Sequence, residues 1–269
     1  MRRYNVALSI AGSDPSGGAG LQADLKTFSA CGCYGATAVV AVVDENTVGV
    51  SGVFPIPPDF VRGQIRSVLG DIGADAVKIG MLHSSELIRT VKDTLAEFGA
   101  GNIVLDPVMV ATSGDPLLEK EAIGTLRDEL IPFSRIITPN IPEAEILLGK
   151  KIVSQDELPD CARRLSQDRK VSVLLKAGHL SDAELTDVFY NAETDSILEL
   201  TSRRLDTRNT HGTGCTLSSA VAAFLARGFG LDEAVMNAKE YIAKAIEAGA
   251  EYEIGHGHGP VHHFFNFWE

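Results

Sequence analysis

The sequence predicts an α/β protein in which a mostly parallel sheet lies between layers of helices. Short β-branched runs alternate with amphipathic stretches of helical length over about the first 180 residues. Each short run is almost entirely apolar, which is typical of strands that are covered on both faces. Sustained alternation of this kind favours parallel strands with helices packed on both sides of the sheet.

The elements are expected in the following order. Six apolar runs are predicted as strands, at residues 5–11, 36–43, 74–79, 102–105, 135–138 and 171–176. Helical patterns lie between them, for example at residues 21–30, 85–98, 120–130 and 157–166. Residues 188–191 and 197–200 read as a hairpin around a polar turn, which adds antiparallel strands. Two long helices are then expected at residues 216–227 and 232–248.

Charge and composition exclude several classes of protein. The 24 Lys+Arg against 36 Asp+Glu give a net charge of −12, and 45% of the 269 residues are hydrophobic. Such a composition excludes disorder. Nucleic acids and anionic membranes are not expected partners, because both need a basic face. No apolar stretch reaches the ~18 residues of a membrane span.

The cysteines and the chain organisation point to a reduced, single-domain protein. Cys31, Cys33, Cys161 and Cys215 form no CxxC pair, and Cys31 and Cys33 are too close for an ordinary disulfide. We therefore expect a cytoplasmic protein. No linker, low-complexity tract or internal repeat interrupts the chain, so residues 1–269 are predicted to form one domain.

A first glycine-rich turn, residues 12–20 (GSDPSGGAG), follows the first strand and precedes a helix. Residues 18–23 formally fit the GxGxxA dinucleotide pattern, which leaves an NAD(P) oxidoreductase open as an alternative. Asp14 and Asp24 stand where a pyrophosphate would be repelled, and the lysine of a Walker motif is missing. A purely structural turn is the other alternative.

The second glycine-rich turn, residues 209–218 (NTHGTGCTLS), opens a long helix. Gly212, Thr213 and Gly214 leave main-chain amides free at the positive end of the helix dipole, a pocket suited to a phosphoryl group. Cys215 lies on the first turn of that helix, where the dipole is expected to lower the pKa of the thiol. A thiolate there can act as general base on an alcohol, although a lone cysteine at a helix start is often only a small buried side chain.

Six sequence blocks together carry a family resemblance. They are residues 11–26 (AGSDPSGGAGLQADLK), 78–81 (KIGM), 106–109 (DPVM), 113–118 (SGDPLL), 138–145 (TPNIPEAE) and 209–218. In this order they resemble the hydroxymethylpyrimidine/phosphomethylpyrimidine kinases of thiamine biosynthesis, members of the ribokinase-like superfamily. The resemblance implies a three-layer α/β/α sandwich and two successive transfers of the ATP γ-phosphoryl group. The acceptors would be 4-amino-5-hydroxymethyl-2-methylpyrimidine and then its monophosphate.

The resemblance also implies roles for particular residues. Cys215 would accept the proton of the substrate hydroxyl while the amides of Gly212, Thr213, Gly214 and Cys215 hold the phosphoryl group. Lys176 would reach the ATP phosphates. Asn140 and Glu143 would order Mg²⁺ through water, with Asp106 near the same cluster. From the residues alone, Asn140 and Glu143 also fit a helix cap, and Lys176 also fits a solvated charge.

The pyrimidine would lie over the first glycine-rich turn. The resemblance places it near Gly12, Ala19, Asp24, Met81 and Val108. Glu45 departs from the family pattern, in which glutamine precedes Asn-Thr. An ionised carboxylate accepts hydrogen bonds but cannot donate one to the ring nitrogen. Our hypothesis is that Glu45 still reads the aminopyrimidine edge, but the departure leaves the choice of substrate open.

Two alternative functions remain, and the sequence also leads to expectations about the assembly, a flap and the C-terminal tail. A pyridoxal-type vitamin kinase and a non-catalytic pyrimidine-binding module are the remaining alternatives, and a homodimer is what the family implies. Residues 107–118 are predicted to form a mobile flap. The four histidines in the tail, His256, His258, His262 and His263, are expected to pack the C-terminal segment rather than to bind a metal.

Overall fold

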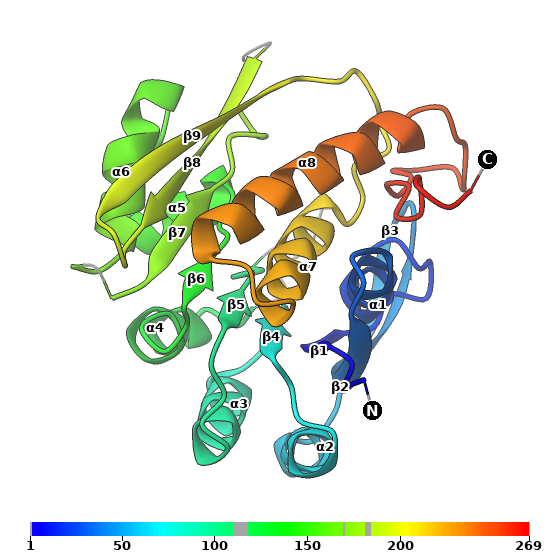
Figure 1. Ribbon diagram of the computed structural model, residues 1–269, viewed down its shortest axis with the longest axis vertical. Coiled ribbons are helices and arrows are strands. Elements are labelled where there is room, and N and C mark those ends of the chain that lie inside the picture. Colours follow the sequence, from blue (N-terminus) through cyan, green and yellow to red (C-terminus); the bar gives the residue numbers. More distant parts are fainter. Residues whose placement is uncertain (1, 110–117, 169, 181–183, 269) are drawn as a thin grey trace.

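The computed structural model describes residues 2–109, 118–168, 170–180 and 184–268, and within them the strands form one sheet (Figure 1). The nine strands lie in the order β3-β2-β1-β4-β5-β6-β7-β8-β9. Their bounds are β1 Val6–Gly12, β2 Tyr34–Asn46, β3 Gly49–Pro55, β4 Ala76–Ile79, β5 Ile103–Leu105, β6 Ile136–Ile137, β7 Ser172–Leu175, β8 Glu184–Asn191 and β9 Ser196–Arg203.

The centre of the sheet is parallel and both edges are antiparallel. Strands β2, β1, β4, β5, β6 and β7 pair in parallel, which confirms the six predicted strands. The predicted hairpin is the antiparallel pair β8–β9. Strand β3 was not predicted. Its side chains are exposed or half-buried and glycine interrupts it twice, so the strand lacks the apolar pattern on which the prediction depended.

The helices cover both faces of the sheet. Their bounds are α1 Gly20–Ala30, α2 Pro58–Asp71, α3 Ser85–Glu97, α4 Ala122–Thr125, α5 Ile141–Leu148, α6 Leu158–Leu165, α7 Thr213–Ala226 and α8 Leu231–Gly249. A π-helical turn at Leu126–Leu130 continues α4. A 3₁₀ turn at Gln155–Glu157 precedes α6. In Figure 1, α1, α7 and α8 lie on one face, whereas α2, α3 and α4 lie on the other. The α/β/α architecture is therefore confirmed.

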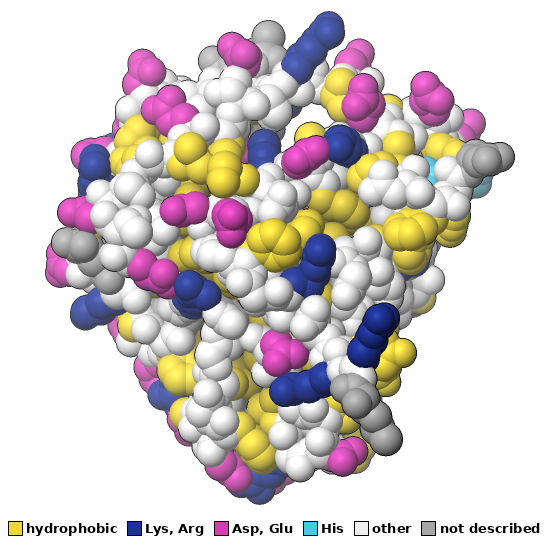
Figure 2. Space-filling model, viewed as in Figure 1, with side chains coloured by type: hydrophobic (Ala, Val, Ile, Leu, Met, Phe, Trp, Pro, Cys, Tyr) yellow, Lys and Arg dark blue, Asp and Glu magenta, His cyan; other side chains and the backbone are white. Residues whose placement is uncertain are grey.

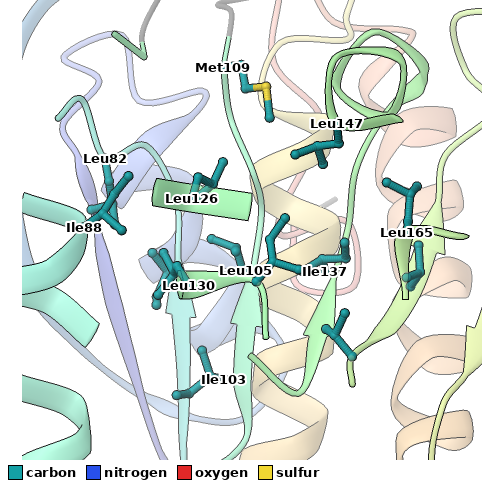
Figure 3. Close-up of a cluster of buried hydrophobic side chains, with 14 of the residues drawn as sticks. Leu82, Ile88, Ile103, Leu105, Met109, Leu126, Leu130, Ile137, Leu147 and Leu165 are labelled. Atoms are coloured by element: carbon teal, nitrogen blue, oxygen red, sulfur yellow. The ribbon is translucent and has the colours of Figure 1, made fainter. Parts of the chain in front are cut away.

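Two apolar cores hold the layers together. The first joins the sheet to α2–α6, and Figure 3 shows its centre, where Leu105 and Ile137 of neighbouring strands meet Leu126 and Leu130. The second joins the other face to α1, α7 and α8 through small side chains, among them Ala220 and Ala223. Because α7 is rich in alanine, it lies almost wholly buried against the middle of the sheet, and its first turn is thereby fixed at the end of the central strands.

No helix in the described ranges is long and apolar enough to cross a membrane.

Helices α2 and α5 were not among the predicted elements, although the Asn140/Glu143 pattern had suggested a helix start. The predicted helix at 120–130 becomes a short α-helix followed by the π-helical turn. Most of the predicted flap, residues 110–117, lies outside the described residues, as does most of the block at 113–118.

Candidate active site

A cavity of about 720 Å³ opens at the carboxyl ends of the parallel strands. This is the edge where α/β sheets of this kind usually bind ligands. The cavity brings together nearly every residue predicted for the site, and its lining includes Gly12, Ala19, Glu45, Met81, Asp106, Val108, Asn140, Glu143, Lys176, Gly212, Thr213, Gly214 and Cys215. Residues more than 200 positions apart in the sequence thus share one cavity.

The two glycine-rich turns touch through their backbones in this cavity. Gly212 has a φ of +75°, and a Cβ built there would collide with the carbonyl oxygen of Gly18. Gly20 has a φ of +53°, and its added Cβ would lie 3.3 Å from the amide nitrogen of Asp14. The Gly20 contact lies within the first turn, whereas the Gly212 contact brings the second turn against the first, so α1 and α7 begin close together.

The second turn leaves amides available to a ligand. The first amides of a helix have no acceptor within the helix. The amide of Thr213 donates weakly to Thr210 O, at 3.3 Å, and that of Thr216 donates to Gly212 O. The first turn of α7 therefore retains amide donors at Gly214 and Cys215, two residues that line the cavity.

Cys215 lies half-buried in the cavity wall, on the first turn of α7. Burial raises the pKa of its thiol to about 11, and the charges of Asp24 and Asp106 act in the same direction. The charge of Lys78 and the amide of Gly20 lower the pKa of Cys215, but they do not compensate for burial. The prediction that the helix start makes this thiol acidic is therefore wrong for the protein without ligands.

Asp24 is not among the residues that line the cavity, so this structure does not support its predicted contact with the pyrimidine. Both Asp24 and Lys78 are 0% exposed, and Lys78 Nζ donates to the two carboxylate oxygens of Asp24 at 2.9 and 2.8 Å. The hydroxyls of Ser9 and Ser219 also donate to Asp24. This buried network joins α1, α7 and two strands, and both oxygens of Asp24 accept hydrogen bonds. Lys78 is the member of the network that lines the cavity.

Asp106 and Lys176 form an ion pair that lines the cavity. Their Nζ and Oδ1 atoms are 3.2 Å apart, and the Thr138 hydroxyl donates to the same oxygen at 3.0 Å. A Cβ built on Gly214 would lie 3.3 Å from Lys176 Nζ and 3.4 Å from Asp106 Oδ2. The pair therefore lies directly against the second glycine-rich turn.

Asn140 and Glu143 form the capping box of α5. Asn140 Oδ1 accepts from the Glu143 amide at 2.9 Å, and Glu143 Oε2 accepts from the Asn140 amide at 2.8 Å. The interpretation as a helix cap is thus confirmed. Burial raises the pKa of Glu143 to about 7; Lys176 opposes this shift, and the charge of Asp106 adds to it. The charge of Lys176 therefore acts on two buried carboxylates, those of Asp106 and Glu143.

The end of the cavity near the first turn is apolar, with a polar group at its side. Val43, Met81 and Val108 pack together there, and a Cβ on Gly12 would lie 2.8 Å from Met81 Cε. Glu45 joins them on the cavity wall, and its carboxylate makes no hydrogen bond with the side chains or backbone of the described residues. Burial and the charge of Asp14 raise the pKa of Glu45, against the opposing effect of His211.

Asp14 and His211 form a buried pair that the sequence did not single out. Asp14 Oδ2 lies 2.9 Å from His211 Nε2 and accepts from the amides of Gly18 and Ala19, while Oδ1 accepts from the amide of Ser16. Although burial opposes ionisation of both groups, these contacts hold the pKa of Asp14 well below its usual range. Asp14, helped by Glu45, raises the pKa of His211. An aspartate inside a glycine-rich turn is the signal that could have revealed the pair.

The opposite end of the cavity is basic, which the sequence also did not reveal. It is lined by His179, Arg203, Arg204 and Lys239 in addition to Lys176. Lys239 Nζ lies 2.6 Å from Asp187 Oδ2, and Asp187 Oδ1 accepts from the Ala177 amide at 2.8 Å. Figure 2 shows basic and acidic side chains interspersed over the visible face. The positive charge in the cavity is therefore a local feature of an acidic protein.

No group of three or more His, Cys, Asp or Glu side chains suited to a metal occurs within the described part of the chain. Mg²⁺ does not require such a cage, since it usually keeps several waters and uses one or two carboxylates together with substrate phosphates. Asp106 and Glu143 meet that requirement chemically.

The known proteins that this chain resembles are kinases, in agreement with a cavity suited to a phosphoryl group. The family model described as "Phosphomethylpyrimidine kinase" matches residues 14–262. The hydroxymethylpyrimidine/phosphomethylpyrimidine kinase of Rhizobium meliloti is 47% identical over 98% of both chains, and that of Escherichia coli is 46% identical over 100% of both. A thiamine biosynthesis bifunctional protein of Geobacter sulfurreducens is 44% identical over 95% of this chain, which spans 51% of that relative.

Solved structures are similar over nearly the whole chain. The ADP complex of Bacillus subtilis pyridoxal kinase has a TM-score of 0.87 and 38% identity, with 97% of each chain covered. The phosphomethylpyrimidine kinase of Clostridium difficile has a TM-score of 0.78 and 41% identity, covering 90% of this chain and 99% of the other. With 38% and 41% identity, these proteins resemble this chain in sequence as well as in fold.

Proposed function

This chain belongs to the phosphomethylpyrimidine kinase family, with its ribokinase-like fold, and from that premise we propose how its cavity works. It is an ATP-dependent kinase of thiamine biosynthesis that phosphorylates 4-amino-5-hydroxymethyl-2-methylpyrimidine and then the resulting monophosphate. The observation that carries the proposal is the position of Cys215 and the open amides of α7 between an apolar end and a basic end of one cavity.

The pyrimidine is assigned to the apolar end. Met81 and Val108 present flat apolar surface to a ring, and the backbone at Gly12 and Ala19 lets the ring approach closely. Glu45 lies at the side of this space, where it faces the aminopyrimidine edge. In its protonated form it can both donate and accept, as reading the amino group and the neighbouring ring nitrogen requires. A Glu45→Ala variant with unchanged kcat/KM for the pyrimidine would rule this role out.

The ATP phosphates are assigned to the basic end, next to the second turn. Lys176 is held at the cavity wall by Asp106, and Asn140 lies beside it on the neighbouring strand end. Asp106 and Glu143 offer the hard oxygen atoms that would hold the Mg²⁺ of ATP, directly or through water, and the bound ion would neutralise charge on the phosphates. Turnover should therefore stop with EDTA and return with Mg²⁺, and metal-independent turnover would refute this assignment.

The transfer step is assigned to the first turn of α7. The substrate hydroxyl oxygen forms a bond to the γ-phosphorus, the bond to the β,γ-bridging oxygen breaks, and ADP leaves with that electron pair. The amides of Gly214 and Cys215, beside those of Gly212 and Thr213, hold the equatorial oxygens of the moving group. The hydroxyl proton passes to the sulfur of Cys215. A thiol with a pKa of about 11 must first lose its own proton, so the reaction should accelerate as pH rises above neutrality.

A pyridoxal-type vitamin kinase is a second candidate activity. The similarity to Bacillus subtilis pyridoxal kinase supports it, because a pyridine alcohol offers the same hydroxymethyl acceptor. The deciding experiment is a phosphate-transfer assay that compares hydroxymethylpyrimidine, its monophosphate and pyridoxal under identical conditions. We expect the two pyrimidines to be preferred, and a higher kcat/KM for pyridoxal would favour the second candidate.

A homodimer is proposed as the assembly. The outer edge of the sheet at β2–β3 exposes large apolar side chains, with Val42, Val53 and Phe54 at 51%, 42% and 69%. Exposed apolar side chains gathered on a sheet edge are typical of protein–protein interfaces. Sedimentation at micromolar concentration tests this, with a Phe54→Ser variant expected to shift the equilibrium toward the monomer.

A further inference from the structure

The β2–β3 hairpin reaches beyond the body of the sheet where it carries Glu45. Strand β1 pairs with β2 only as far as Ala41. The next bond to the body is the one from the Val43 amide to the Ser13 hydroxyl, at 3.1 Å. Beyond that point, residues 44–46 pair only with β3, the edge strand of the sheet. Something else must hold the hairpin tip if Glu45 is to keep a fixed position.

Residues 255–263 of the tail, here called the strap, contact this tip at Thr47. The amides of His256 and Gly257 each donate to Thr47 Oγ1 at 3.2 Å, and the amide of His258 donates to Thr47 O at 2.8 Å. Figure 1 shows the red C-terminal segment near the hairpin tip, the end at which β3 begins. Three successive amides of the strap are thus directed at one residue, two positions after Glu45.

The other half of the strap is fixed to the turn that carries Cys215. The amide of His211 donates to Gly259 O at 3.0 Å, and Pro260 continues this pairing. His263 Nε2 lies 3.0 Å from the hydroxyl of Thr216, the neighbour of Cys215. One continuous segment therefore joins the pyrimidine-reading hairpin to the catalytic turn.

Glycines make these close contacts possible. A Cβ on Gly257 would collide with Thr47 O, and one on Gly255 would collide with Thr47 Oγ1. A Cβ on Gly259 would collide with Asn209 Oδ1. Asn209 is itself buried and donates to Gly249 O and Tyr252 O, both at 2.7 Å. Close contact with the hairpin and with the second turn therefore explains the glycines of the strap. No metal or ligand is needed to account for them.

We propose that the strap positions the hairpin: through Thr47 it holds Glu45 over the pyrimidine and ties it to the Cys215 turn. This inference deepens the proposed function and rests on it for the identity of the bound ring. Thr47 is a positioning residue in this arrangement. It acts through Glu45 on affinity for the acceptor, and it lies away from the basic end where the nucleotide is assigned.

The test uses the full-length protein and the variant Thr47→Val, which removes the hydroxyl but keeps the shape. We expect the KM for hydroxymethylpyrimidine to rise about ten-fold, as for the loss of one well-placed acceptor. The KM for ATP should stay within about two-fold. Thr47→Ser keeps the hydroxyl and should restore the pyrimidine KM. Gly257→Ala should act like Thr47→Val, and Gly101→Ala is its control, because nothing lies within 4 Å of a Cβ at that position.

Hydrogen exchange tests the strap independently of turnover. Amides in peptides covering residues 44–56 should exchange at least ten-fold faster in Thr47→Val than in Gly101→Ala. Unchanged exchange would overturn the proposal, and so would equal rises in both KM values. If the wild-type protein phosphorylates neither pyrimidine, the proposed function fails, while the exchange measurement still decides whether the strap holds the hairpin.

Discussion

The two glycine-rich turns have similar composition and use their amides in opposite ways. In the first turn, the carboxylate of Asp14 accepts from the amides of Ser16, Gly18 and Ala19. In the second, no carboxylate of the described residues accepts from the first amides of α7, and Thr213, Gly214 and Cys215 line the cavity. The first turn is closed by its own anion, whereas the second is open to one from outside.

This difference explains why a dinucleotide-type pattern at residues 18–23 does not make a dinucleotide site. The donors that a pyrophosphate would need are already bonded to Asp14. The contact between Gly212 and Gly18 then allows the closed turn to serve as a fixed surface against which the open turn is placed. Anion binding therefore depends on which amides remain free, and glycine content alone does not indicate this.

The largest expected effect comes from the open turn. Cys215→Ala should lower kcat by about 10² to 10⁴, the usual range for a general base, with little change in pyrimidine affinity. Steady-state kinetics and calorimetric binding measure the two quantities separately. Cys161→Ala is the control, since that sulfur is buried in the other core. An unchanged kcat would refute the role of Cys215 as base.

The next effect concerns the contact between the two turns. Gly212→Ala adds a Cβ at a positive φ and against the Gly18 carbonyl, so the free energy of unfolding should fall by about 3 kcal/mol or more. Gly228→Ala is the matched control. That glycine has a φ of +87° and open space around it, so its variant reports backbone strain alone. Equal losses in the two variants, measured by denaturant unfolding, would mean that the turns are not pressed together.

A smaller effect is expected from the closed turn. Asp14→Asn keeps one oxygen but places an amide group where the second oxygen accepts hydrogen bonds. Loss of such buried bonds should reduce the free energy of unfolding by about 1 to 3 kcal/mol. Asp44→Asn serves as the control because Asp44 is exposed on the neighbouring hairpin. If both variants are as stable as the wild type, the Asp14 carboxylate does not hold the turn together.

The smallest effect is the pH dependence of the Asp14–His211 pair. Because Asp14 raises the pKa of His211 in the folded protein, the pair stabilises fully below the unfolded-state value of about 6.5. That stabilisation is lost as pH rises through the higher folded value. The difference in unfolding free energy between the wild type and His211→Gln should therefore be greater at pH 6 than at pH 9. A difference that grows with pH would contradict the assigned sign.

Much of the fold could be predicted from local pattern, because buried parallel strands and amphipathic helices have distinctive spacing. Strand β3 could not, since it is an exposed edge strand without an apolar pattern. In the site, the residues that were predicted next to strand ends lie in one cavity. The topology places Gly12, Asp106 and Lys176 at the same sheet edge.

The sequence did not reveal the properties of a side chain that depend on which residues the fold places around it. Asp24 looks like any helix carboxylate in the sequence, and only the fold brings Lys78, 54 positions away, against it. The pKa of Cys215 depends on burial that a helix-start rule does not contain. Asp14 and His211 are separated by 197 positions, so their pairing needs the contact between two turns.

The protonated state of Cys215 affects how readily its sulfur is oxidised. Peroxides attack thiolates far faster than thiols, and a sulfur with a pKa of about 11 is almost entirely a thiol at neutral pH. Burial raises the pKa of Cys31 to about 12 and of Cys33 to about 11 as well. Oxidative inactivation should therefore be slow, in contrast to enzymes whose activated cysteines are permanently ionised.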